Sequence, residues 1–217
     1  YGKDYRMFVQ PVNWFVLGSV GGKALTDEGG DGGARYRVVR DLDVRRPVLA
    51  HEICHYAAHR DLDALERKFK KHGAPVPWWI PELKKLSRAK GVTADLPAFL
   101  DASRRFQRMG WKLGMEAARR SPLLAGFHFL QLADTERYEN SNGVLDCFDD
   151  PNPGTPAPEE FLRHNGDAVL LADLPRRTFF EKERIRIPVA ISHYARTLSG
   201  KGELAWSLRD KAGGTFA

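Results

Sequence analysis

The chain has 217 residues, a formal net charge of +6 and a hydrophobic fraction of 42%, enough apolar material to bury a core, which excludes a wholly disordered protein. Basic residues are interspersed with acidic ones along helical segments, and no arginine or lysine stripe interleaved with aromatics is present. We therefore expect solvated helix faces and no nucleic-acid partner. No apolar run reaches the length of a membrane span, so we expect no membrane partner.

Strands and loops are predicted for the N-terminal part of the chain. Residues 1–17 are rich in β-branched and aromatic side chains, which indicates a strand followed by an aromatic-lined loop that contains Trp14. The glycine-dense residues 18–33 lack a GxGxxG spacing followed by a helix, so they predict a surface loop and no phosphate cradle. An apolar run then leads directly into His51 and Glu52, which are adjacent in the sequence.

Helical periodicity dominates the middle of the chain. Apolar residues recur at helical spacing over residues 61–71, 81–86 and 93–120, and proline and glycine separate the first two segments. The sequence therefore predicts three helices, of which the last is long and amphipathic. Within it, Met109 and Met115 are expected to fill the core.

Strands are predicted again after residue 122. Residues 123–132 form a nearly continuous apolar run, typical of a strand buried on both faces, which ends at Asp134. A short helix is expected at 159–163. Beyond Asp167 the apolar period falls to two, which predicts the start of a β-sandwich. Its expected strands lie at 169–171, 178–180, 184–192 and 203–208.

The central residues 51–55 spell HExxH and allow two incompatible interpretations. In a helix, His51 and His55 would lie one turn apart as zinc ligands, with Glu52 as the base that activates water in a metalloprotease. Asp61 would be the third ligand in the metzincin pattern, although Ala58 replaces the glycine that turns the chain back. In a short buried strand, Glu52 would instead stand at the C-terminal end, where (β/α)8 barrel enzymes keep catalytic residues.

The linked order of motifs resembles that of glycoside hydrolase family 2. Residues 46–52 (RPVLAHE) are similar to the family's K-P-(apolar)3-x-E at the end of strand seven, and residues 124–127 (LAGF) are similar to the start of strand eight. Residues 51–53 (HEI), 126–134 (GFHFLQLAD) and 143–146 (GVLD) resemble a polysaccharide-degrading subgroup. That subgroup continues its HEI with Gly-Gln, where this chain has Cys54 and His55.

The resemblance implies an α/β fold, with the C-terminal portion of a (β/α)8 barrel over residues 1–178 and the start of an immunoglobulin-like β-sandwich over 179–217. It implies retaining hydrolysis of a poly- or oligosaccharide with Glu52 as nucleophile and without a cofactor. The residues expected to contact the carbohydrate are His51, His128, Gln131, Asp134 and Trp14.

A retaining glycosidase needs a second carboxylate about 5–5.5 Å from the nucleophile. The resemblance implies an Asn-Glu pair for this role, and since no such pair occurs here we expect it upstream of Tyr1. The chain is then a fragment whose partner is the remainder of its parent, a secreted or periplasmic enzyme. A third interpretation is a carbohydrate-binding remnant without turnover.

Overall fold

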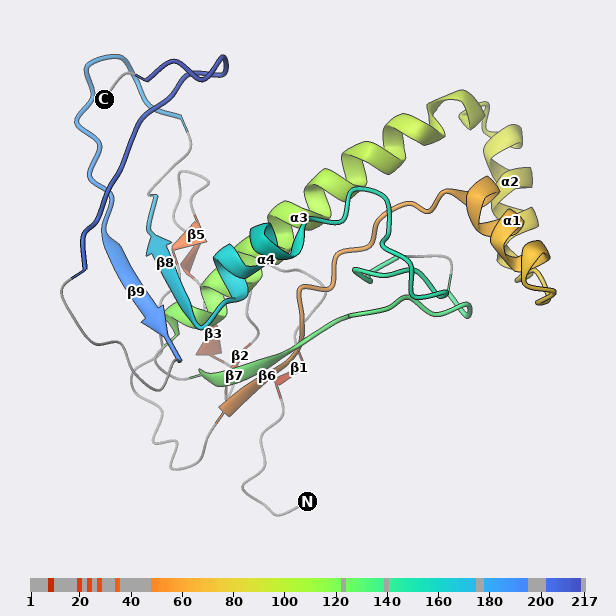
Figure 1. Ribbon diagram of the computed structural model, residues 1–217, viewed down its shortest axis with the longest axis horizontal. Coiled ribbons are helices and arrows are strands. Elements are labelled where there is room, and N and C mark those ends of the chain that lie inside the picture. Colours follow the sequence, from red (N-terminus) through yellow and green to blue (C-terminus); the bar gives the residue numbers. More distant parts are fainter. Residues whose placement is uncertain are drawn as a thin grey trace.

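A computed structural model of the chain describes residues 48–121, 124–138, 141–174, 178–194 and 202–215, together with five two-residue strands nearer the N-terminus. The order of elements is mixed α and β (Figure 1). Two pairs of short strands lie within or directly after residues 18–33, the glycine-dense stretch for which the sequence predicted a loop. They are β2 (Ser19–Val20) with β3 (Lys23–Ala24) and β4 (Asp27–Glu28) with β5 (Ala34–Arg35), both antiparallel.

The centre of the fold is a parallel sheet of three strands in the order β1-β6-β7. Its members are β1 (Phe8–Val9), β6 (Val48–Ile53) and β7 (Leu124–Phe129). The predicted strand at the Glu52 position is therefore confirmed. The zinc interpretation requires a helix that runs from His51 through His55. That helix is wrong, because the backbone of residues 48–53 pairs with the two neighbouring strands.

Between the two longer parallel strands the chain makes a helical excursion, as a parallel connection demands. It contains α1 (Leu62–Lys71), α2 (Trp79–Ala89), the short 3-10 helix η1 (Thr93–Asp95) and α3 (Leu96–Arg120). These confirm the three predicted helices. Figure 1 shows α3 lying over the sheet, with α1 and α2 gathered at its N-terminal end.

The buried face of α3 differs from the predicted one. Met115 is fully buried as expected, but Met109 is 40% exposed and faces away from the core. The buried face instead follows Gln107, Trp111 and Met115. The helix turns this face inward because two glycines on it allow the chain after β6 to approach closely. The prediction for Met109 is wrong because the apolar positions alone did not reveal that polar and glycine positions share the inner face.

The C-terminal part adds α4 (Pro158–Asn165) and an antiparallel pair, β8 (Ala168–Ala172) with β9 (Val189–His193). The expected strands at 178–180 and 203–208 are wrong, since neither segment has a partner strand within the described residues. The pairing of β8 with β9 spans the expected boundary at 178/179. The described sheets are small and none closes into a barrel, so the barrel portion, the sandwich and the two-domain division stay predictions.

Candidate active site at the ends of the parallel strands

Glu52 lies in a bulge at the carboxyl end of β6. Ala50 pairs with Phe127 and Ile53 pairs with Phe129, so β6 uses three steps where β7 uses two. The extra residue distorts the ladder at this point, as β-bulges do next to active sites. The ladder then resumes, because the backbone N–H of Leu130 donates to the carbonyl of Ile53 at 3.1 Å.

The backbone around Glu52 is strained. Glu52 has φ +54° and Cys54 has φ +66°, the left-handed region that residues with a side chain rarely adopt. Each such residue costs on the order of 1 kcal/mol and persists only where the surroundings over-determine it, which is common at active sites. The side chain of Glu52 is exposed. A carboxylate is thus held in an unusual backbone conformation at the sheet edge where strand ends meet.

Asp134 organises the loop that follows β7. Its side chain is almost fully buried, and its Oδ1 accepts the backbone N–H groups of Asn142 at 2.9 Å and Gly143 at 2.7 Å. Its Oδ2 accepts from the Ser141 hydroxyl at 2.5 Å and from the Asn152 side-chain amide at 2.9 Å. The chain's own donors therefore occupy both oxygens, and the carboxylate closes the loop between residues 134 and 152.

A second set of buried polar groups joins this loop to α3 and to the segment after β6. Arg104 donates to Ser141 Oγ at 2.6 Å and to Gln107 Oε1 at 2.9 Å. Gln107 in turn donates to the carbonyls of Tyr56 at 2.7 Å and Ser141 at 2.9 Å. Burial lowers the pKa of Arg104 to about 10, against the opposing field of Asp134, and the guanidinium stays charged at neutral pH. The loops after both strands are fixed to one helix.

His55 follows Glu52 by three residues and is half-buried. Its Nε2 lies 2.8 Å from the side-chain nitrogen of Asn142, a residue whose backbone N–H donates to Asp134 Oδ1. The ring therefore joins the post-β6 turn to the Asp134 loop. In this position it is a link between the two loops that surround the end of β6.

The structure brings some of the predicted carbohydrate-contacting residues together and leaves others undescribed. His128 is exposed on β7 and Gln131 is half-buried just after it, so both lie on the strand beside Glu52. Direct contact of Asp134 with a sugar stays a prediction, although its oxygens already have protein partners. Trp14 and the side chain of His51 lie outside the described parts of the structure.

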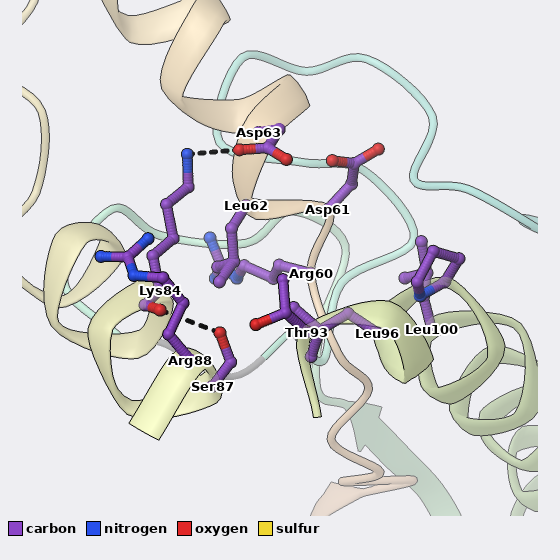
Figure 2. Close-up of a pocket in the computed structure, with 11 residues that line it drawn as sticks. Arg60, Asp61, Leu62, Asp63, Lys84, Ser87, Arg88, Thr93, Leu96 and Leu100 are labelled. Carbon is purple, nitrogen blue, oxygen red and sulfur yellow. Dashed lines mark hydrogen bonds and ion pairs between the residues drawn. The ribbon is translucent and has the colours of Figure 1, made fainter. Parts of the chain in front are cut away.

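Two of the cavities in the described part of the chain lie beside α1. Figure 2 shows the larger, of about 250 Å³, between α1, α2 and the start of α3. Two of its cationic groups have partners: Lys84 pairs with Asp63 at 2.5 Å, and Arg60 donates to the Thr135 carbonyl at 3.1 Å. The smaller cavity, of about 200 Å³, shares Arg60 and Asp61 with it. Glu52 lines neither cavity.

Of the three zinc ligands in the alternative interpretation, the two whose side chains the structure describes, His55 and Asp61, have other partners. Asp61 is the N-cap of α1, and its carboxylate accepts the backbone N–H of Ala64 at 2.9 Å. Among the described residues, no group of three or more histidine, cysteine, aspartate or glutamate side chains is arranged to hold a metal ion. His55 has Asn142 as its neighbour instead.

Sequence reasoning missed the polar residues that fix these loops. Arg104 and Gln107 look like part of a solvated helix face, and residues 141–143 (SNG) look like an ordinary turn. The available signal was the spacing of Arg104 and Gln107 in line with Trp111, which places two polar groups on an apolar stripe. Asn152 lies in a proline-rich turn, and the sequence gives no signal that its side chain is buried.

No protein-family model matches this chain, and no curated protein matches it. None of the helices in the described segments combines the length and hydropathy that a bilayer crossing demands.

Proposed function

We propose that the chain is the C-terminal part of a retaining glycoside hydrolase in which Glu52 is the nucleophile. The observation that carries the proposal is the position of Glu52, exposed in a strained bulge at the carboxyl end of the central parallel strand. Residues at this end of parallel strands are the ones that barrel enzymes use for chemistry. The family 2-like order of motifs supports the same assignment.

In the proposed reaction, one Glu52 oxygen attacks the anomeric carbon as the bond to the leaving oxygen breaks. A carboxylic acid from the remainder of the parent protonates that oxygen. Water, deprotonated by the same group, then attacks the anomeric carbon of the glycosyl ester, which releases the sugar with retained configuration and restores the Glu52 carboxylate.

The other residues take supporting roles in this proposal. His128 and Gln131 contact sugar hydroxyls from the neighbouring strand, together with His51, and Trp14 stacks on a sugar ring. The barrel continues into the parent chain, a β-sandwich follows, and the protein works outside the cytoplasm as a secreted or periplasmic enzyme.

The test is covalent labelling of Glu52. A 2-deoxy-2-fluoro glycosyl donor with a dinitrophenolate leaving group needs no general acid, so labelling does not depend on the missing carboxylate. We expect a panel of such reagents with different sugars to include one that adds a single glycosyl mass, mapped to Glu52 by peptide mass spectrometry.

Glu52→Gln should abolish the label, whereas Glu136→Gln, at an exposed carboxylate, should keep it. Absence of any label across the panel, both in this chain and in its extended parent, would contradict the proposal. Sugar binding under those conditions would favour the non-catalytic remnant.

A further inference from the structure

We infer that Gly110 and Gly114 of α3 form a groove that seats Tyr56 and Cys54, and that this seat holds Glu52 in its working conformation. Cys54 and Gly114 are then positioning residues for the nucleophile. The inference rests on the proposed function.

The two glycines lie one helical turn apart on the same face of α3. A Cβ added to Gly114 would lie 2.7 Å from Sγ of Cys54. A Cβ added to Gly110 would overlap the Tyr56 ring, at 2.6 Å from Cδ1 and closer still to two other ring carbons. Two side chains from the turn after β6 therefore occupy the space that these glycines leave.

Cys54 and Tyr56 are both buried, and both form hydrogen bonds to α3. Cys54 Sγ lies 3.6 Å from the carbonyl of Trp111, and burial raises the pKa of its thiol, so the S–H remains to donate. The Tyr56 carbonyl accepts from Gln107 at 2.7 Å. The Tyr56 N–H donates to the Cys54 carbonyl at 2.9 Å. Residues 54–56 are thus fixed to α3 over two helical turns.

The contact of Cys54 with the glycine groove stabilises the strained backbone at Glu52. Left-handed Glu52 and Cys54 flank Ile53, which is completely buried. Returning Cys54 to a negative φ would swing its side chain out of the groove and reverse the direction of the chain after Ile53. Packing of the Cys54 side chain against Gly114 therefore opposes relaxation of the turn. The backbone that carries the Glu52 side chain is fixed from its C-terminal side.

A pair of substitutions tests the inference. Gly114→Ala places a methyl group against Sγ, although alanine favours helix over glycine by up to about 1 kcal/mol. Cys54→Ala removes Sγ and keeps Cβ, which lies 4.0 Å from the methyl group added at position 114, so the side chain of residue 54 still packs against α3. We expect Gly114→Ala to slow fluorosugar labelling of Glu52 roughly 100-fold, as a misplacement near 1 Å does, in the rate constant more than in reagent affinity. Adding Cys54→Ala should restore most of the rate.

Gly202→Ala is the matched control, since it adds one methyl group where nothing lies within 4 Å and should leave labelling unchanged. Thermal unfolding of each variant shows that labelling is measured on folded protein. Normal labelling of folded Gly114→Ala, or no rescue by Cys54→Ala, would overturn the positioning role. Wild-type protein that stays unlabelled, both as this chain and in its extended parent, would overturn the proposed function and this role with it, whereas a defect confined to Gly114→Ala supports both.

Discussion

At the scale of single residues, a buried carboxylate holds together the loop that follows β7. Asp134 is 5% exposed and accepts four hydrogen bonds, and Arg60 lies 3.9 Å from its Oδ2. The sequence marked it as a polar group ending a strand, which is correct, but its partners arrive from residues 141–152. A buried charge needs such compensation, and here the compensation shapes the loop.

Asp134→Asn should destabilise the protein by roughly 3 kcal/mol, because the new amide hydrogens face donors and the Arg60 charge loses its partner. Urea denaturation followed by circular dichroism measures the loss. The carboxylate of Glu136 is exposed and forms a single long ion pair, at 3.9 Å from Arg137. Glu136→Gln should therefore change the free energy of unfolding by less than about 0.5 kcal/mol. Equal effects of the two substitutions would refute the role assigned to Asp134.

At the scale of elements, α1 and α2 form a small unit with its own core. Leu65 and Phe69 of α1 pack against Trp79 and Ile80 of α2. Cys147 and Phe148, from the loop after β7, pack against this cluster. The Trp79 indole N–H donates to the Glu136 carbonyl at 2.8 Å, which fastens this unit to the loop after β7. Trp78, its sequence neighbour, points to solvent and is 74% exposed.

The two adjacent tryptophans provide a matched pair for mutation. Trp79→Ala should cost about 3–5 kcal/mol, because it empties a core position and removes a hydrogen bond. Trp78→Ala should stay within about 0.5 kcal/mol, as exposed positions do. Chemical denaturation of both variants measures the difference. A large loss on replacing Trp78 would show that it is covered in solution.

At the scale of the whole molecule, the C-terminal tail adds little to the described fold. Residues 202–215 are exposed throughout, and Trp206 keeps 75% of its surface. The hydrogen bonds within this described segment are local, such as the Asp210 N–H donating to the Gly214 carbonyl at 2.8 Å. The alternating Leu204, Trp206 and Leu208 have the pattern of a sandwich strand without a sheet to face within the described residues.

Ending the chain after residue 201 should therefore change the free energy of unfolding by less than about 0.5 kcal/mol. Val169→Ala, at a buried position of β8, serves as the positive control and should cost about 2 kcal/mol. Thermal unfolding of the three proteins measures this. If the truncation costs as much as Val169→Ala, the tail packs on the molecule as a sandwich strand would.

The sequence by itself determined the elements whose signal is local. The helices α1, α2 and α3 follow from apolar residues at helical spacing, with proline and glycine separating the first two. The alternation over residues 184–192 located β9 but overstated its length, because a strand extends only as far as its partner, here β8.

Only the tertiary structure decided the state of residues 48–53 and the surroundings of Glu52. A short apolar run followed by His-Glu-Ile fits a strand or a buried helix equally, and pairing with β1 and β7 settled it. The left-handed turn and the glycine groove of α3 depend on residues more than 50 positions apart, such as Cys54 and Gly114. The Asp134 loop depends on hydrogen bonds from residues 141–152, which no local pattern announces. Local patterns report which face of an element is apolar, whereas burial of a polar group or a strained turn is fixed by what packs against it.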